Sequence, residues 1–136
     1  MKITTRMIDD HQFASSNEAG NTVHIDMRKA AEKTGQSPVE MLQSSLAACA
    51  GVEVVGMIKK RKKSVDALRV EVTAVRNGEI PRWLKEIHCK YVLTSPDATE
   101  EELEKVVRLA MEKYCSVASS LKSVITFSVE IERPLN

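Results

Sequence analysis

Two cysteines lie in settings that could support redox chemistry. Cys49 is part of the uncharged run MLQSSLAACAGV, and Cys115 is part of KYCSVASSLKS, 66 positions further along the chain. Both segments are helical in pattern, and the small residues around each cysteine let another part of the chain come close. Two thiols brought together from distant helices can act in turn, because one sulfur is oxidised and the other resolves it as a disulfide. Two buried cysteines that only fill core space are the alternative interpretation.

The reactivity of Cys49 depends on the charges around it. A thiol in a buried apolar helix stays protonated unless a cation or a helix N-terminus faces its sulfur. Glu53 lies one turn further on and about 40° around the helix, where an isolated carboxylate opposes thiolate formation. A functional Glu53 therefore requires an arginine that bridges it to the sulfur. A solvated or structurally paired Glu53 is an equal alternative.

The setting of Cys115 leaves two alternatives open. If a helix begins at Tyr114 or Cys115, its free N–H groups and its dipole would stabilise the thiolate. If one helix continues from Ala98, that stabilisation is absent. The third cysteine, Cys89, falls on the apolar face of a predicted strand, where a core role is the favoured interpretation.

Other motifs give weaker signals. The three cysteines and three histidines lack CxxC or HxxxH spacing, so we expect no metal site. The run KKRKK at 59–63 is typical of nucleic-acid binding, but cations at a helix C-terminus also complement the helix dipole, and the second interpretation is favoured. No GxGxxG, P-loop or GxSxG motif occurs, so we expect no nucleotide cofactor.

Composition limits the class of protein. The 136 residues fit a single domain, 1–136, and the net charge of +1 favours neither a nucleic-acid binder nor an acidic solvating protein. The opening MKITTRMIDD has no apolar stretch after its lysine, and no apolar run approaches the roughly 20 residues that span a bilayer. An odd cysteine count without a secretion signal indicates a reducing compartment. We therefore expect a cytoplasmic protein without a membrane segment.

The hydrophobic pattern predicts an α+β fold with helices on one face of a mainly antiparallel sheet. A helix begins at Ser37, the N-cap, with Pro38 in its first turn and Glu40 three residues after the cap, and should run to about Lys63. Its stretch from Met41 to Val52 has no charge on any side, which indicates burial in a dimer. A second, amphipathic helix is predicted over 98–114, and strands are predicted over 3–8, 11–16, 21–27, 68–76, 86–95 and 123–132.

Three segments resemble the OsmC family, which includes osmotically induced proteins and organic hydroperoxide resistance proteins. They are SPVEMLQSSLAACAGVEVV, IPRWLKEIHCKYVL and AMEKYCSVASSLK, and the likeness covers nearly the whole chain. Its most specific parts are the Pro-x-Glu helix start that leads to Cys49 and the Tyr-Cys-Ser-Val element around Cys115.

The resemblance implies an intertwined homodimer around two long central helices, with sites at the dimer interface. It also implies a thiol-dependent peroxidase that prefers organic hydroperoxides and is reduced by a dithiol. Cys49 matches the family's peroxidatic cysteine, and Cys115 matches its resolving cysteine. A binding or redox-sensing dimer with the family fold but an altered site is the alternative.

The chain departs from the pattern of the active peroxidases in two places. Those proteins carry a glutamate directly after the helix-opening proline, where this chain has Val39. The glutamate pairs with an arginine from the N-terminal hairpin, and the corresponding NEAGNTVHI contains none. The available substitutes are Arg6, Arg28 and Arg82. Glu53 together with one of them could replace the missing pair, which is a hypothesis.

Overall fold

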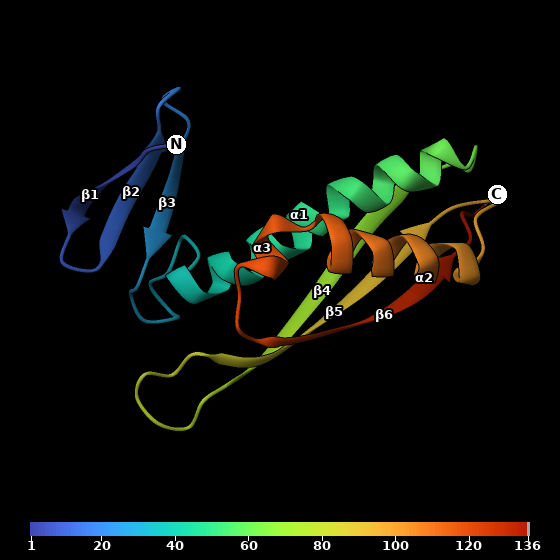
Figure 1. The fold of residues 1–136 in the computed structure, drawn as a ribbon. Coiled ribbons are helices and arrows are strands. Elements are labelled where there is room, and N and C mark those ends of the chain that lie inside the picture. Colours follow the sequence, from blue (N-terminus) through green and yellow to red (C-terminus); the bar gives the residue numbers. More distant parts are fainter. Residues whose placement is uncertain (136) are drawn as a thin grey trace. The chain divides into compact units, whose positions relative to one another are not determined.

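Three short strands form an antiparallel sheet at the start of the chain. In the computed structural model, which describes residues 1–135, these are β1 (Ile3–Asp9), β2 (Gln12–Asn17) and β3 (Thr22–Asp26), in the order β1-β2-β3 (Figure 1). Gly20 has a φ of 87° in the turn between β2 and β3, a conformation that glycine adopts without steric cost. This sheet belongs to the first of two compact units, Met1–Leu42.

The first unit has almost no core of its own. Of residues 1–42, only Ser15 and Asp26 are buried. Ile3, Met7 and Val23 on its strands are 63%, 65% and 49% exposed. A three-stranded sheet usually needs a covered apolar face to be stable. The sheet therefore presents apolar side chains that remain uncovered in a single chain.

The long helix α1 (Pro38–Lys60) begins as predicted. The Ser37 N–H donates to Glu40 Oε1 at 3.0 Å and the Glu40 N–H donates to Ser37 Oγ at 3.2 Å, which is a complete capping box. The helix ends three residues before the predicted Lys63, because Lys62 adopts a left-handed φ of 64° and the Lys63 N–H turns back to the Ile58 carbonyl.

By length and composition alone, α1 could cross a membrane. The prediction that no apolar stretch was long enough is therefore wrong, because it counted only the uncharged run and α1 extends beyond that run past Glu40 and Glu53. The core helix of a globular fold has the same features. Only 28% of the most apolar 18 residues of α1 are buried, so much of the helix surface is uncovered in a single chain.

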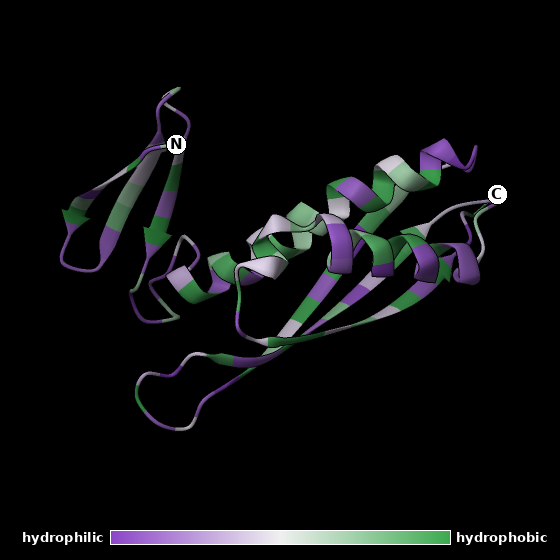
Figure 2. Cartoon of the chain, viewed as in Figure 1, coloured by the Kyte–Doolittle hydropathy of each residue, from purple (hydrophilic) through white to green (hydrophobic). Residues whose placement is uncertain are grey.

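The second unit, from Gln43 onward, is built on the sheet β4 (Ala67–Arg76), β5 (Leu84–Thr94) and β6 (Val124–Glu132). Its order is β4-β5-β6, with β4 antiparallel and β6 parallel to β5. Apolar and polar residues alternate along β4, as Figure 2 shows. The parallel β6 departs from a purely antiparallel sheet, because the helical segment after β5 carries the chain back to the end where β5 began.

Helices α1 and α2 (Glu100–Leu109) cover one face of this sheet (Figure 1). The core lies beneath them and includes the predicted apolar face of β5, whose four residues are fully buried: Ile87, Cys89, Tyr91 and Leu93. Thr99 caps α2 in a second capping box, with Glu102 as its acid. The α+β class predicted from the sequence is thus the class of the fold.

Within residues 1–135 one chain contributes one long helix, α1, and a second copy would be needed for the two central helices that the family resemblance implies. The predicted helix over 98–114 is α2, ten residues long, followed by a five-residue π turn, η1 (Ala110–Tyr114), and a separate short helix, α3 (Ser116–Ser119). The Cys115 N–H bonds to the Ala110 carbonyl at 2.8 Å, five residues back, and Cys115 itself is extended. The wider turn breaks the helical repeat just before the cysteine.

Candidate functional site

Helix α1 brings Cys49 onto the sheet of the second unit. Gln43 donates a hydrogen bond from Nε2 to the Val72 carbonyl at 3.0 Å, and a Cβ on Gly51 would lie 3.9 Å from the Leu68 side chain. Eight helical residues and four strand residues both advance roughly 12–13 Å, so α1 runs alongside β4 in the opposite direction. Cys49 therefore lies over the stretch of β4 between Val72 and Leu68 and is half-buried there.

Cys115 lies where η1 ends and α3 begins. It is the N-cap residue of α3, and its Sγ accepts a hydrogen bond from the Ala118 N–H at 3.3 Å. Its side chain is buried, with 3% of the residue exposed. Of the two alternatives left open by the sequence, the structure therefore has a new helix starting directly after Cys115.

The two cysteines meet within one chain. Each thiol acts on the other: the Cys115 side chain lowers the pKa of Cys49, and the Cys49 side chain raises that of Cys115. The largest cause that lowers the pKa of Cys49 is the backbone N–H of Val117, and the N–H of Ser116 adds to it. These are the first two N–H groups of α3, which have no partner inside the helix.

The environment divides the two thiols into different roles. Burial is the largest cause that raises the pKa of Cys115, and the neighbouring Cys49 raises it further. The pKa of Cys49 is lowered despite its partial burial, because backbone donors stabilise its thiolate. The thiolate therefore forms at Cys49, while Cys115 stays protonated.

The negative charge of Glu53 raises the pKa of Cys49, as expected for a carboxylate without a cationic partner. Within residues 43–135, no arginine forms an ion pair with Glu53. Arg82 lies in the loop between β4 and β5, where its carbonyl accepts a hydrogen bond from Arg76 Nε at 3.0 Å. No contact in this unit supports the hypothesis that Glu53 orients an arginine.

The two remaining candidate arginines, Arg6 and Arg28, belong to the first unit. Arg28 binds the buried Asp26 with two donors, Nε at 3.1 Å and Nη2 at 2.8 Å, and also donates to Thr34 Oγ1 at 3.0 Å. Its guanidinium therefore has a structural partner inside that unit. Hydrogen bonds from the Arg28 side chain, followed by the backbone N–H of Thr34, hold the pKa of Asp26 far below its ordinary range.

Cys89 is fully buried on β5, as expected for a core cysteine. Burial raises its pKa to about 11, so it stays a neutral thiol. The basic run 59–63 closes α1, and within it Lys63 lies 3.9 Å from the carboxylate of Glu102. This position agrees with a role at the end of the helix.

Two parts of this site could not be identified from the sequence. The first is the pair of backbone N–H groups of α3, which appeared only as one of two alternatives for Cys115. The second is Tyr91, fully buried, whose hydroxyl has no hydrogen-bond partner in the described part of the chain. Strand alternation placed Tyr91 on the core face, but no sequence signal shows that a buried hydroxyl is unpaired.

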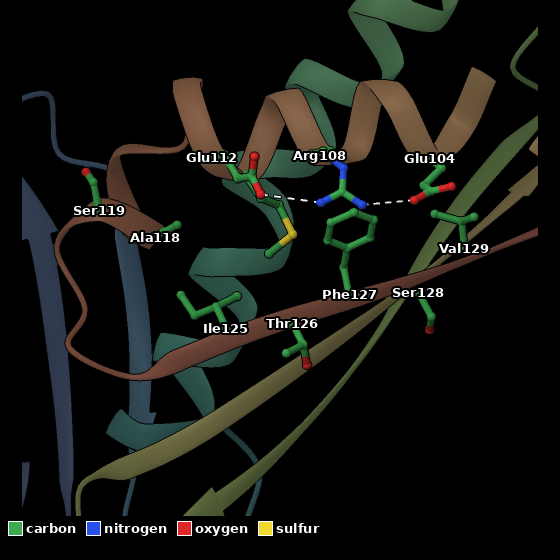
Figure 3. A pocket seen from close by; sticks show the side chains of 11 residues that line it. Glu104, Arg108, Glu112, Ala118, Ser119, Ile125, Thr126, Phe127, Ser128 and Val129 are labelled. Carbon is green, nitrogen blue, oxygen red and sulfur yellow. Dashed lines mark hydrogen bonds and ion pairs between the residues drawn. The ribbon is translucent and has the colours of Figure 1, made fainter. Parts of the chain in front are cut away.

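A cavity of about 590 Å³ opens beside α3, between α2 and β6. Figure 3 shows Arg108 held between Glu104 and Glu112, with the ring of Phe127 beneath it. Ala118 and Ser119 belong to its lining, but neither Cys49 nor Cys115 does. The lining carries two glutamates and one arginine, a net charge of −1, beside the apolar side chains of Met111, Ile125, Phe127 and Val129, so the cavity suits a largely apolar molecule without negative charge.

Comparison with known proteins agrees with this fold. Residues 30–130 match the family described as OsmC-like protein. The chain belongs to the OsmC family. The resemblance found in the sequence is thereby confirmed.

This OsmC-like chain has full-length relatives. Protein YhfA of Escherichia coli K12 is 27% identical over 133 residues, which cover 96% of this chain and 98% of YhfA. A hypothetical protein from Aquifex aeolicus VF5 has a crystal structure with a TM-score of 0.86, 26% identity and coverage of 98% and 97%. The organic hydroperoxide resistance protein OhrB of Bacillus subtilis shares the fold, with a TM-score of 0.62, 20% identity and coverage of 96% of each chain.

Proposed function

We propose that this OsmC-like protein is a thiol-dependent peroxidase that reduces small organic hydroperoxides, with Cys49 as nucleophile and Cys115 as resolving thiol. The observation that supports it most is the set of donors at Cys49: two backbone N–H groups of α3 and the thiol of Cys115 all lower its pKa. A thiolate is the nucleophilic form of cysteine. OhrB, which shares the fold, is named for resistance to organic hydroperoxides.

The reaction follows from the division of charge between the thiols. The Cys49 thiolate attacks the terminal oxygen of the hydroperoxide, the O–O bond breaks, and the alkoxide leaves and takes a proton to become an alcohol. The oxygen stays on Cys49 as a sulfenic acid. Cys115 then attacks the Cys49 sulfur, its proton joins the departing hydroxyl to form water, and a Cys49–Cys115 disulfide remains.

A dithiol reductant completes the cycle. Its thiolate attacks one sulfur of the disulfide, and its second thiol then releases the protein with both cysteines reduced and the reductant oxidised to a disulfide. Attack at Cys115 expels Cys49, whose lower pKa makes it the better leaving group.

The donors at α3 take over the role that a charged pair has in other peroxidases. Val39 stands where a glutamate would orient an arginine, and backbone N–H groups need no such residue. Neutral donors lower a thiol pKa less than a full positive charge does, and Glu53 opposes them. We therefore expect a slower peroxidase than one with an arginine at the sulfur.

The working form is a homodimer in this proposal. Leu42 and Val52 on α1 are 41% and 72% exposed, although they belong to the uncharged part of the helix. The strands of the first unit expose apolar side chains as well. A second copy that covers both surfaces would bury them at the usual gain for apolar area. Sedimentation should show a dimer, and Val52→Glu should weaken it.

We place the protein in the cytoplasm, where its cycle can operate. All three cysteines are free thiols in this structure. A reducing compartment supplies the dithiols that return the Cys49–Cys115 disulfide to the reduced state.

The central test is direct. Reduced protein is treated with cumene hydroperoxide and its mass is measured. The wild type should lose two hydrogens, Cys115→Ser should gain one oxygen on Cys49, and Cys49→Ser should do neither. Cys89→Ser is the matched control and should behave like the wild type. Retention of free thiols at both Cys49 and Cys115 under excess peroxide would contradict the proposal.

The cavity beside α3 supports a second candidate function, the binding of an uncharged apolar molecule without turnover. In this case the cysteines pack or sense oxidation. The neutral dye Nile red should bind with increased fluorescence, and Phe127→Trp should reduce binding by filling the cavity lined by Phe127. Unchanged dye binding in Phe127→Trp would exclude this cavity as the site.

A further inference from the structure

Tyr91 combines complete burial with an unused hydrogen-bond donor. Its side chain is 0% exposed on the central strand β5. Among the residues that the structure describes, its hydroxyl is the one buried side-chain oxygen or nitrogen without a partner. Buried hydroxyls are nearly always hydrogen-bonded, because an unpaired one has lost its hydrogen bonds to water without a replacement, which costs free energy of folding. A phenylalanine would fill the same core position without this penalty.

The position of Tyr91 indicates which group could accept a hydrogen bond from its hydroxyl. Tyr91 pairs with Val70 on β4, and Val70 lies midway between Val72 and Leu68, the two residues that α1 contacts. Cys49 lies over this same stretch. Tyr91 thus lies at the same position along the sheet as Cys49, the proposed nucleophile on α1.

The other thiols surround the same point. Cys89 is two residues before Tyr91 on β5, so both side chains project from one face of the strand. The charges of Cys89, Cys115 and Cys49 each raise the pKa of Tyr91, after burial as the first cause. The phenol is therefore protonated at neutral pH and belongs to the cluster of three sulfurs.

In the reduced protein the Tyr91 hydroxyl has no hydrogen-bond partner, and thiol sulfurs such as those of the cluster are only weak acceptors. Oxidation of Cys49 changes the cluster, because it adds an oxygen atom, a much stronger acceptor. We propose that the Tyr91 hydroxyl is the donor that holds the oxygen bound to Cys49 after the hydroperoxide has reacted. This inference rests on the proposed peroxidase function and adds a catalytic residue to it.

The hydrogen bond has a defined consequence for the chemistry. It withdraws electron density from the sulfenic oxygen and fixes its direction, while the phenol keeps its own proton. When Cys115 attacks the Cys49 sulfur, the S–O bond breaks, and the Cys115 proton joins the departing hydroxyl as water. A donor on that oxygen favours its departure. It also makes the sulfenate less nucleophilic toward a second peroxide, which would give sulfinic acid.

The test uses Cys115→Ser, in which the sulfenic acid on Cys49 persists. Adding Tyr91→Phe to this variant should shorten the lifetime of the sulfenic acid and speed its conversion to sulfinic acid by roughly three- to tenfold, as expected for loss of one hydrogen bond. Tyr114→Phe is the matched control, since Tyr114 is next to Cys115 in the sequence but 46% exposed. It should leave both rates unchanged.

Thermal unfolding separates this role from a structural one. Tyr91→Phe should leave the Tm of the reduced protein unchanged or raise it, and should lower the Tm of the sulfenic form alone. Equal effects on both forms, or unchanged sulfenic-acid lifetimes, would overturn the role of Tyr91 and leave the peroxidase function intact. A Cys115→Ser protein whose Cys49 gains no oxygen would overturn both.

Discussion

The backbone N–H of Val117 is a hydrogen-bond donor to the sulfur of Cys49, and it is the largest cause that lowers the pKa of this thiol. The donor is free because Val117 lies in the first turn of α3, where N–H groups have no helical partner. The break in the helix before Cys115 therefore serves both cysteines. It turns the chain so that Cys115 caps α3 while the next N–H groups reach Cys49.

The first prediction concerns the pH dependence of Cys49. A depressed pKa leaves the thiolate populated at pH values below the ordinary value of about 8.5 for a free cysteine. The rate of alkylation of Cys49 by iodoacetamide should therefore reach half of its maximum below that pH. Peptide mapping by mass spectrometry separates the three cysteines, and Cys89 should stay unmodified in the folded protein because it is fully buried. A midpoint at or above the ordinary value would contradict this prediction.

The second prediction distinguishes two roles for Glu53. Its charge raises the pKa of Cys49, so Glu53→Gln should lower that pKa further and speed alkylation on the acid side of the profile. If Glu53 instead orients an activating arginine, the same substitution should slow alkylation. Glu79→Gln, in the loop between β4 and β5, is the control and should leave the profile unchanged.

The third prediction concerns Asp26 in the first unit. Folding lowers the pKa of Asp26, so its carboxylate stabilises the fold at all pH values above the ordinary value and loses this effect only as the pH falls toward the depressed one. Asp26→Asn should destabilise the segment after β3 at neutral pH. The Arg28 and Thr34 amides, which donate to Asp26 at 2.9 and 2.8 Å, should exchange with solvent faster in the variant. Unchanged exchange at both amides would show that the carboxylate has no such role.

The fourth prediction concerns the cap of α2. Thr99→Ala removes the acceptor of the Glu102 N–H, at 3.1 Å, and should lower the free energy of unfolding by about 1 kcal/mol. Urea denaturation measures this change. Thr99→Ser keeps the hydroxyl and should restore most of the stability, whereas an equal loss in both variants would point to the methyl group instead of the cap.

Features that depend on neighbours in the sequence could be predicted without the structure. The start of α1 at Ser37 was predictable because a capping box needs only residues three positions apart. The buried face of β5, with Cys89 and Tyr91, was predictable because strand side chains alternate with a period of two. The two cysteines could be singled out for the same local reason, from the small and uncharged residues around them.

Features that depend on distant pairings could not be predicted in this way. Residues 110–119 contain no glycine or proline, so their sequence permits a continuous helix as well as the π turn and the break at Cys115. The parallel pairing of β6 is of the same kind, because strand direction depends on how the preceding helical segment crosses the sheet.

The amino-acid sequence by itself determined the α+β class, the start of α1, the apolar face of β5 and the resemblance to the OsmC family, and it singled out Cys49 and Cys115 as candidates. Only the tertiary structure decided that the N–H groups of α3 reach the sulfur of Cys49, and that the buried hydroxyl of Tyr91 stays without a partner. Local periodicity shows which face of an element is apolar. The meeting of two segments far apart in the chain depends on how both helices pack on one sheet, and this packing leaves no periodic signal in either segment.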